Sequence, residues 1–240
     1  MRRRSCELDL THYDTDKVPN LYLDHYDPVL LPYVEQEITL LEIGIHRGGS
    51  LLLWRDYFPR GKIIGIDLQV PLDWTAVDRI QIFQGHQQDI AFLSRVARET
   101  APDGFDIIID DASHIANLTR VSFWHLFDNH LKSGGVYAIE DWGTGYWDDW
   151  PDGKAYPDAG SWLPTILSGL RRVRGIRRLR AVQRTRYPNH SFGMVGFVKE
   201  LVDEQGASDL TRRTFRGTTT RPSKFRNLLV VPSIVFVTKR

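Results

Sequence analysis

The sequence predicts an α/β protein built on a mostly parallel, doubly wound sheet. Three observations support this fold class. Short apolar runs alternate with longer segments of helical periodicity between residues 38 and 141, which is typical of a parallel sheet with helices on both faces. The apolar runs are nearly continuous, as expected for strands buried on both sides. Two closing apolar runs flank Pro232-Ser233 and predict a C-terminal antiparallel hairpin at one edge of the sheet.

The alternating part of the chain contains five predicted strands joined by segments that include three predicted helices. The strands cover residues 39–43, 62–67, 79–83, 105–109 and 135–139. The helices cover residues 50–57, 90–100 and 115–130. In the last of these, five residues form a broad apolar stripe: Leu118, Val121, Phe123, Leu126 and Phe127. Right-handed crossovers would place these helices on the two faces of the sheet.

The rest of the chain has a different pattern. Residues 143–160 are rich in Gly, Asp, Pro and Trp and predict an irregular loop. Helices are expected over 161–174 and 191–204, and the closing hairpin over 228–231 and 234–237. No linker is visible, so we expect a single domain over 1–240, with a cap at 1–37 and a lid on the acceptor side at 143–190.

Charge is balanced overall but unevenly distributed. The chain has 31 basic and 30 acidic residues, a net charge of +1, which argues against a dedicated nucleic-acid-binding protein. The segment Arg171–Arg186 holds eight arginines and no acid, so the remainder carries −7. We interpret this segment as a solvated helix face or a contact between subunits of a homo-oligomer. Docking on an anionic substrate, a membrane surface or nucleic acid is the alternative.

Cysteine content and hydropathy indicate the compartment. Cys6 is the only cysteine, which excludes an intrachain disulfide and a cysteine zinc cluster. The most apolar run, residues 228–237, is interrupted and too short to span a bilayer. We therefore expect a cytoplasmic protein without a membrane span.

Polar residues follow the first three predicted strands, where open parallel sheets bind ligands. Glu42 precedes a loop with glycines at 44 and 48, and Asp67 closes the second strand. Asp67 is placed to accept the hydroxyls of a ribose. The third strand leads to a polar turn that contains Gln88 and Asp89, placed to meet an adenine edge. The spacing of the glycines is not that of the dinucleotide fingerprint.

This ordered set resembles the Rossmann-like class I S-adenosylmethionine-dependent methyltransferases. The resemblance implies that the acidic residue at 42 and the glycine loop hold the amino-acid portion of the cofactor. Asp110, at the end of the fourth strand, is counted with the cofactor-binding residues. A structural role for Asp110 in the turn is the alternative.

Carboxylates also gather at the ends of the fourth and fifth strands. Asp111 follows one strand, and Glu140 and Asp141 follow the other. If these strands are neighbours, their ends lie about 4.8 Å apart, and the three carboxylates can converge on one cation. An all-oxygen set without a thiolate favours Mg²⁺ over zinc. His114, three residues after Asp111, is then placed to remove the proton of a hydroxyl group.

The motifs over 105–147 narrow the resemblance. Asp-Asp-Ala-Ser-His, Leu-Phe-x-x-x-Leu-Lys-x-Gly-Gly, Ile-Glu-Asp and Thr-Gly-Tyr-Trp are similar to those of sugar O-methyltransferases of macrolide biosynthesis, the mycinamicin and macrocin type. Thr15-Asp16-Lys17 and His25-Tyr26 also match. The resemblance implies Mg²⁺ at Asp111, Glu140 and Asp141, with His114 as the base. Ala112 replaces the family's usual glycine, and the loop 143–160 differs in detail.

The size of the chain and its arginine-rich segment are also similar to those of mycobacterial O-methyltransferases of methylmannose polysaccharide synthesis. This second resemblance implies that the acceptor is a sugar or oligosaccharide, and specifically a mannoside. Six aromatic residues that suit the faces of sugar rings follow the proposed metal site: Trp142, Tyr146, Trp147, Trp150, Tyr156 and Trp162. Anchoring the loop to the core is the alternative role for several of them. Two other acceptors compete with the mannoside, namely a macrolide deoxysugar and a catechol-type small molecule. A further alternative is that the protein is a non-catalytic cofactor-binding module that docks through its arginines.

Overall fold

The computed structural model describes residues 3–70, 74–75, 77–156, 189–207 and 221–240. The predicted helix over 161–174, the arginine segment Arg171–Arg186 and Trp162 lie outside the described residues. Within the described part, no helix is long and apolar enough to cross a membrane.

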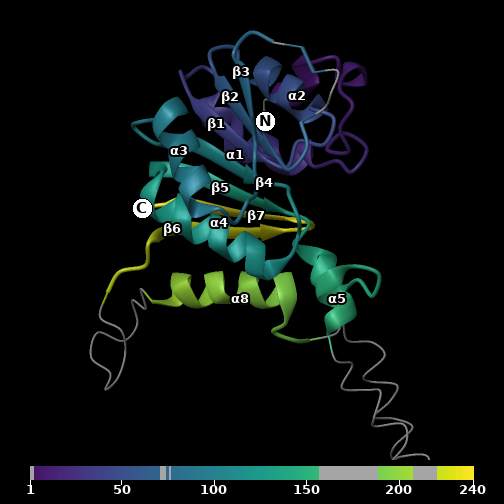
Figure 1. The fold of residues 1–240 in the computed structure, drawn as a ribbon, viewed down its shortest axis with the longest axis vertical. Coiled ribbons are helices and arrows are strands. Elements are labelled where there is room, and N and C mark those ends of the chain that lie inside the picture. Colours follow the sequence, from purple (N-terminus) through teal and green to yellow (C-terminus); the bar gives the residue numbers. More distant parts are fainter. Residues whose placement is uncertain (1–2, 71–73, 76, 157–188, 208–220) are drawn as a thin grey trace, which may run out of the picture.

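One seven-stranded sheet forms the centre of the fold, in the order β3-β2-β1-β4-β5-β7-β6 (Figure 1). Strands β1 to β5 run parallel to one another, β7 pairs antiparallel with β5, and β6 pairs antiparallel with β7. The predicted fold class is therefore confirmed. The strands are β1 Thr39–Ile43, β2 Lys62–Asp67, β3 Ile80–Gln84, β4 Phe105–Asp110, β5 Leu131–Glu140, β6 Phe225–Val231 and β7 Ile234–Lys239.

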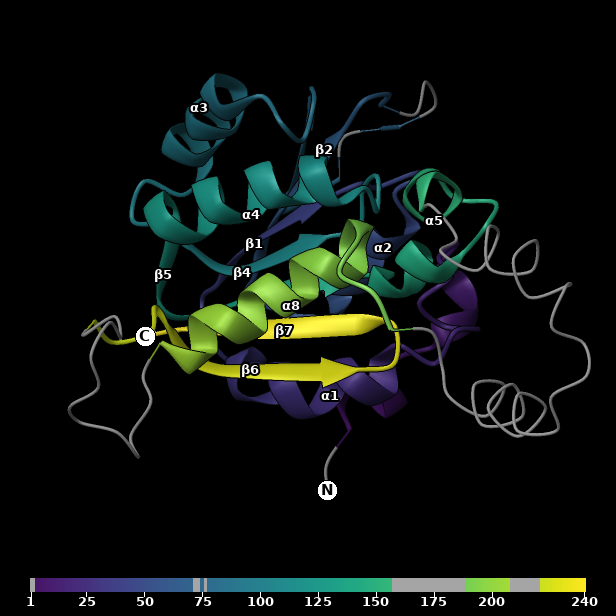
Figure 2. The ribbon, with the colours of Figure 1, turned by 90° about the horizontal axis from the view of Figure 1, so that it is seen from below.

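Helices cover both faces of the sheet, as the pattern predicts. Helices α1 and α2 lie on one face, and α3, α4 and α8 lie on the other (Figure 2). Their buried side chains form two separate core clusters, one on each face. Within the residues that the structure describes, the α-helices are α1 Leu23–Leu30, α2 Gly49–Tyr57, α3 Ile90–Thr100, α4 Ala116–Asn129, α5 Pro151–Ala155 and α8 Gly193–Gly206. The 3₁₀ helices are η1 Arg4–Glu7, η2 Leu10–His12, η3 Leu31–Tyr33 and η4 Trp142–Tyr146.

The loop expected over 143–160 is more regular than its composition indicates. It contains most of η4 and the short helix α5, which begins with Pro151 in its first turn. Asp152, within α5, is buried and accepts hydrogen bonds from the backbone amides of Ala116 and Met194. This carboxylate fixes the loop to the starts of α4 and α8, a long-range contact that the local sequence does not reveal.

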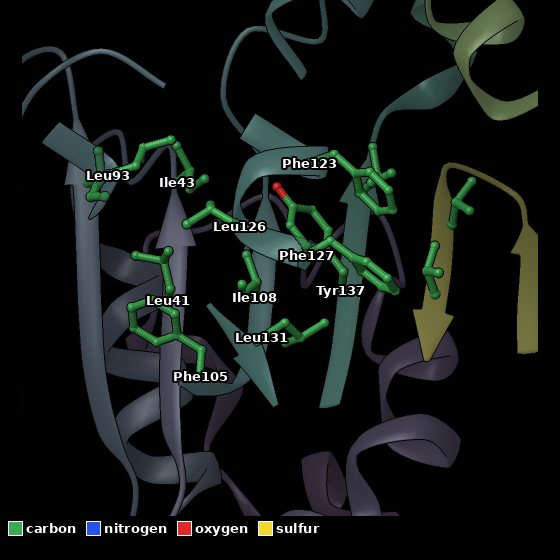
Figure 3. Close-up of a cluster of buried hydrophobic side chains, with 14 of the residues drawn as sticks. Leu41, Ile43, Leu93, Phe105, Ile108, Phe123, Leu126, Phe127, Leu131 and Tyr137 are labelled. Carbon is green, nitrogen blue, oxygen red and sulfur yellow. The ribbon is translucent and has the colours of Figure 1, made fainter. Parts of the chain in front are cut away.

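Aromatic packing between α4, β5 and α8 forms the core beside the site (Figure 3). Phe123 is fully buried and its ring contacts those of Phe127, Tyr137 and Phe197 at centroid distances of 5.1, 4.8 and 5.5 Å. Such pairs contribute about 0.5–1.5 kcal/mol each beyond their buried area. This rigid layer supports β4 and β5, whose ends carry the predicted metal ligands.

Asp110 lies inside this layer and does not reach a cavity. Its carboxylate is buried and accepts hydrogen bonds from the hydroxyls of Ser122 (2.7 Å) and Tyr137 (3.1 Å). This placement favours the structural alternative, and the cofactor-binding role of Asp110 stays a prediction. Burial raises the pKa of Asp110 to about 6, although both hydrogen bonds act to lower it.

We expect the raised pKa of Asp110 to make stability fall as pH rises. Between about pH 4 and pH 6 the folded protein binds more protons at this carboxyl than the unfolded chain does. The free energy of unfolding should therefore decrease across this window, by up to about 3 kcal/mol. Asp110→Asn should lack this slope, and denaturant unfolding of both proteins at pH 4.5, 5.5 and 7 measures the difference. Parallel pH profiles would contradict the assignment.

Candidate active site

A cavity of about 940 Å³ opens at the carboxyl ends of the parallel strands. It spans the point where strand order reverses, between β1 and β4, which is the usual ligand site of open α/β sheets. Its volume lies within the range of about 300–1,000 Å³ that is usual for small-molecule and cofactor sites. Six sequence-predicted site residues line it, namely Gly44, Asp67, Gln88, Asp111, His114 and Asp141.

Three residues in the strand-end loops around the cavity adopt left-handed backbone conformations. The φ angles are 48° at His46, 51° at His114 and 52° at Asp141. Non-glycine residues in this region are uncommon, although Asp and His tolerate it better than most. Backbone strain of this kind clusters at functional sites, and here it follows β1, β4 and β5. The strained turns point to a functional site at this end of the sheet.

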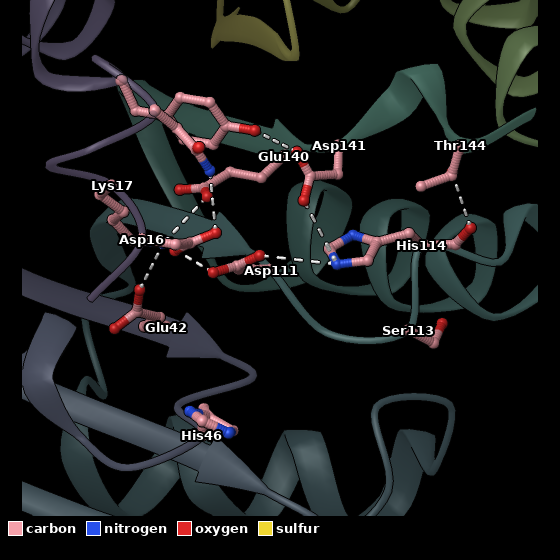
Figure 4. A network of polar contacts seen from close by, with 12 residues as sticks. Asp16, Lys17, Glu42, His46, Asp111, Ser113, His114, Glu140, Asp141 and Thr144 are labelled. Atoms are coloured by element: carbon pink, nitrogen blue, oxygen red, sulfur yellow. Dashed lines mark hydrogen bonds and ion pairs between the residues drawn. The ribbon is translucent and has the colours of Figure 1, made fainter. Parts of the chain in front are cut away.

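Asp111, His114 and Asp141 form a compact group in the cavity (Figure 4). One donor atom from each lies within 4.8 Å of the others. The Nε2 atom of His114 is 3.7 Å from Asp111 Oδ1 and 3.7 Å from Asp141 Oδ2. The hydroxyl of Tyr22 donates a hydrogen bond to Asp141 Oδ1. The neighbouring ends of β4 and β5 thus bring together two of the three predicted ligands and the predicted base.

Glu140 lies beside this group but does not belong to it. Its side chain is fully buried, and its oxygens accept hydrogen bonds from the hydroxyl of Tyr26 (2.5 Å) and from Lys17 Nζ (2.9 Å). Strand alternation explains the difference, because Glu140 is the last residue of β5 whereas Asp141 begins the turn. The role of Glu140 as a metal ligand stays a prediction.

The site carries an excess of negative charge. Burial raises the pKa of Glu140 well above its usual value, and the neighbouring carboxylate of Asp111 raises it further. Burial also raises the pKa of Asp141. The largest cause in both groups is burial, which disfavours the charged form of a carboxyl. Two cavity-lining carboxylates within reach of one another are oxygen donors of the kind that Mg²⁺ prefers, so the residues present fit a divalent cation.

Two predicted cofactor-binding acids face away from the cavity. Glu42 is fully buried behind the β1 loop, where it accepts hydrogen bonds from Ser50 Oγ (2.7 Å) and Trp54 Nε1 (3.2 Å). Asp89 caps the N-terminus of α3 by accepting a hydrogen bond from the amide of Phe92. Neither residue lines the cavity. Both therefore shape elements next to the site, and their direct contact with a cofactor stays a prediction.

The two predicted glycines serve close packing within the protein. A Cβ on Gly44 would lie 2.1 Å from the carbonyl oxygen of Asp111, so only glycine lets the β1 loop pass the end of β4. Gly48, at φ 81°, does not line the cavity, and a Cβ there would meet the ring of Trp74 at 2.3 Å. Glycine is needed at both positions, but the immediate reason is packing against the chain.

Asp67 organises the same loop and also faces the cavity. Its Oδ2 atom accepts hydrogen bonds from the amides of Ile45 (2.8 Å) and His46 (3.1 Å), and Oδ1 accepts one from Gln69 (3.0 Å). A carboxylate has about four acceptor positions, so capacity for one further donor remains. Asp67 is thus placed to hold the loop and to accept a hydroxyl of a bound ligand.

Gln87 is a cavity residue that the sequence prediction missed. Its Oε1 atom accepts a hydrogen bond from the amide of Ser113 (3.2 Å), while its buried Nε2 atom has no partner. An unsatisfied buried donor is costly, so a polar ligand that supplies an acceptor fits here. The sequence pattern predicts the polar turn after the third strand, but it names Gln88 in that turn and not its neighbour Gln87.

The aromatic loop places one ring next to the acid group. The ring of Trp150 lies 5.8 Å from that of His114, and its Nε1 atom donates to the carbonyl of Ser113 (3.3 Å). Trp147 is 48% exposed, and its ring lies 6.3 Å from that of Trp150. Trp142 is instead tied to the carbonyl of Val231. The loop therefore contains both an anchor and exposed aromatic surface.

Part of this chain is similar in sequence to proteins that are named as O-methyltransferases. It is 44% identical over 135 residues to mycinamicin VI 2''-O-methyltransferase of Micromonospora griseorubida. This alignment covers 52% of this chain and 32% of the relative. It is 38% identical over 173 residues to L-olivosyl-oleandolide 3-O-methyltransferase of Streptomyces antibioticus, which covers 68% and 42%. The chain thus spans less than half the length of these two relatives. No family model matches.

A solved structure shares the fold along nearly the whole chain. MycE methyltransferase from the mycinamycin biosynthetic pathway, in complex with Mg and SAH, aligns with a TM-score of 0.69 at 32% identity. The alignment covers 97% of this chain and 54% of MycE. A complex of MycE that also contains mycinamycin VI aligns with a TM-score of 0.57 at 29% identity. The chain therefore has the class I methyltransferase fold.

Proposed function

We propose that this protein is a magnesium-dependent O-methyltransferase that transfers a methyl group from S-adenosylmethionine to a sugar hydroxyl. The observation that carries the proposal is the placement of His114 Nε2 3.7 Å from both Asp111 and Asp141 in the cavity. A base and a pair of oxygen donors are what activation of an alcohol requires. The relatives that act on sugars of macrolides support the same chemistry.

The two sides of the cavity suit the two parts of the reaction. Asp67, Gln87 and Gln88 would hold the cofactor near the ends of β2 and β3. Asp111 and Asp141, with Glu140 as the predicted third ligand, would hold Mg²⁺ at the ends of β4 and β5. When bound, the cofactor supplies a methyl group on a sulfonium and Mg²⁺ supplies a Lewis acid.

His114 would act as the general base that accepts the proton of the acceptor hydroxyl. In the transfer, the acceptor hydroxyl gives its proton to Nε2 while its oxygen forms a bond to the methyl carbon. The methyl group would come from the sulfonium of a bound S-adenosylmethionine, so S-adenosylhomocysteine would be the other product. The side chain of His114 is only 13% exposed, and Thr144 Oγ1 donates to its backbone carbonyl (3.2 Å). The imidazole is thereby held in place, and positioning supplies much of the rate.

The acceptor we propose is a sugar, because the exposed ring of Trp147, beside the half-buried ring of Trp150, suits the apolar face of a pyranose. MycE has been solved with mycinamycin VI, which makes a glycosylated macrolide the first class to test. A mannoside is the second class, proposed from the sequence alone. A catechol is the third, because it would use the same metal and base.

Asp67→Ala is expected to weaken binding of S-adenosylhomocysteine by about 10- to 100-fold. The substitution removes hydrogen bonds to a charged acceptor, worth about 1.5–3 kcal/mol each, both from the β1 loop and from the ligand. Calorimetric titration of the purified proteins measures the change. Asp103→Ala, in an exposed turn, is the matched control. An unchanged dissociation constant for Asp67→Ala would remove this residue from the cofactor site.

The proposal as a whole is tested by methyl transfer from labelled cofactor to macrolide glycosides, mannosides and catechols, each with and without EDTA. We expect turnover with one sugar class and its loss on chelation. Cofactor binding without turnover on any acceptor, unaffected by EDTA, would favour a non-catalytic binding module. Homo-oligomeric assembly and a cytoplasmic location stay predictions from the sequence.

A further inference from the structure

The ammonium group of Lys17 is buried among three carboxylates (Figure 4). Its Nζ atom lies 2.6 Å from Asp111 Oδ2, 2.9 Å from Glu140 Oε2 and 3.4 Å from Glu42 Oε1, and the side chain has no exposure. Burial acts to lower the pKa of Lys17, but the three carboxylates raise it well above its usual value. The three carboxylates therefore surround Lys17 Nζ on the side of each strand end that faces it.

The three carboxylates come from different strands. Glu42 belongs to β1, beside the proposed cofactor, whereas Asp111 and Glu140 come from the ends of β4 and β5, beside the proposed metal. Lys17 thus connects both sides of the cavity through a single atom. It also occupies Asp111 Oδ2, so the Oδ1 atom of the same carboxylate is the one nearest to His114.

Lys17 also anchors a wall of the cavity. Asp14, Thr15 and Asp16, the residues immediately before it, line the cavity. This segment packs directly on the start of α2, since a Cβ on Gly49 would meet the carbonyl oxygen of Asp14 at 2.0 Å. The lysine fixes the end of the segment by entering the carboxylate cluster.

We propose that Lys17 is a positioning residue that joins the cofactor side of the cavity to the metal side. This inference rests on the proposed function. Through its contacts the ammonium holds Glu42 behind the cofactor loop and orients Asp111 toward the metal, and through its backbone it keeps residues 14–16 in the wall. Without the ammonium, the three neighbouring carboxylates would lose the contacts that hold them in these positions and would move apart.

Lys17→Met tests the inference through binding, independently of activity. Calorimetry would measure S-adenosylhomocysteine binding without metal, and then Mg²⁺ binding to the protein saturated with S-adenosylhomocysteine. We expect both affinities to fall at least about tenfold, in line with the effect of removing a group that orients metal ligands. Lys154→Met, at an exposed position, should leave both affinities unchanged.

The outcomes separate this inference from the proposed function. A wild-type protein that binds neither ligand would overturn the proposed function. Wild-type binding of both ligands, with unchanged affinities in a folded Lys17→Met variant, would overturn only the role of Lys17 and leave it a purely structural residue.

A second variant covers the case in which Lys17→Met does not fold. Removing one member of a buried ion pair is far more destabilising than removing both, so Lys17→Met/Glu140→Gln should regain the folded state. Glu140→Gln alone is its reference. We expect the double variant to bind S-adenosylhomocysteine at least about tenfold more weakly than Glu140→Gln, because Glu42 and Asp111 still lack their cation. Equal affinities in these two proteins would overturn the inference.

Discussion

His114→Ala is expected to lower the rate of methyl transfer by about 100- to 10,000-fold, the usual contribution of a general base. Binding of S-adenosylhomocysteine should stay within about twofold of wild type, because the residues proposed to hold the cofactor lie at the ends of β2 and β3. Single-turnover transfer at saturating cofactor, together with calorimetry, measures both quantities. The combination of lost chemistry and retained binding identifies a base.

His12→Ala is the matched control, since His12 is exposed on the N-terminal segment and should show wild-type behaviour. Full activity of His114→Ala would remove the base from the mechanism. A parallel loss of activity and cofactor affinity would instead indicate that His114 holds the local fold. The left-handed backbone at this position makes circular dichroism of the variant a necessary companion measurement.

The sheet was accessible from the sequence because its determinants are local. Each parallel strand is a short apolar run followed by a polar loop, so the strand ends and the residues after them could be placed within a few positions. Asp111, His114 and Asp141 were found in this way, since the carboxyl ends of neighbouring parallel strands meet at one edge. Periodicity gave α3 and α4 for the same reason.

Side-chain direction at the strand ends was less accessible. Asp110 and Asp111 are adjacent, yet the first is the last residue of β4 and points into the core, while the second follows the strand and lines the cavity. Glu140 and Asp141 repeat this arrangement at the end of β5. A change of one residue in register reverses the face, and the sequence does not specify where a strand ends to that accuracy.

The local sequence pattern does not predict the burial of Lys17 or its partners. Its partners Asp111 and Glu140 lie 94 and 123 residues away in the chain, and a lysine is almost never fully buried unless it is paired. The motif Thr15-Asp16-Lys17 contributes to the family resemblance, but the burial of the lysine depends on how the N-terminal segment crosses the ends of the strands. Contacts of this range appear only once the fold is assembled.

Asp141→Asn is expected to raise the Mg²⁺ concentration needed for half-maximal activity by about 10- to 100-fold or more. That is the loss seen when residues that merely orient metal ligands are removed, and a direct ligand should matter at least as much. Asparagine suits the substitution because it tolerates the left-handed backbone that Asp141 adopts. Its amide oxygen can also still accept the hydrogen bond from Tyr22.

The metal dependence of this variant separates two roles for Asp141. If the carboxylate binds Mg²⁺, high concentrations of the ion should restore much of the rate, while S-adenosylhomocysteine binding without metal stays unchanged. If it serves only to orient His114, 3.7 Å away, the rate should stay low at every Mg²⁺ concentration. Asp149→Asn, exposed in the same loop, should respond to Mg²⁺ as wild type does. A wild-type magnesium response in Asp141→Asn would exclude Asp141 as a ligand, and the negative charge of the site would then need Asp111 and Glu140 alone to hold the ion.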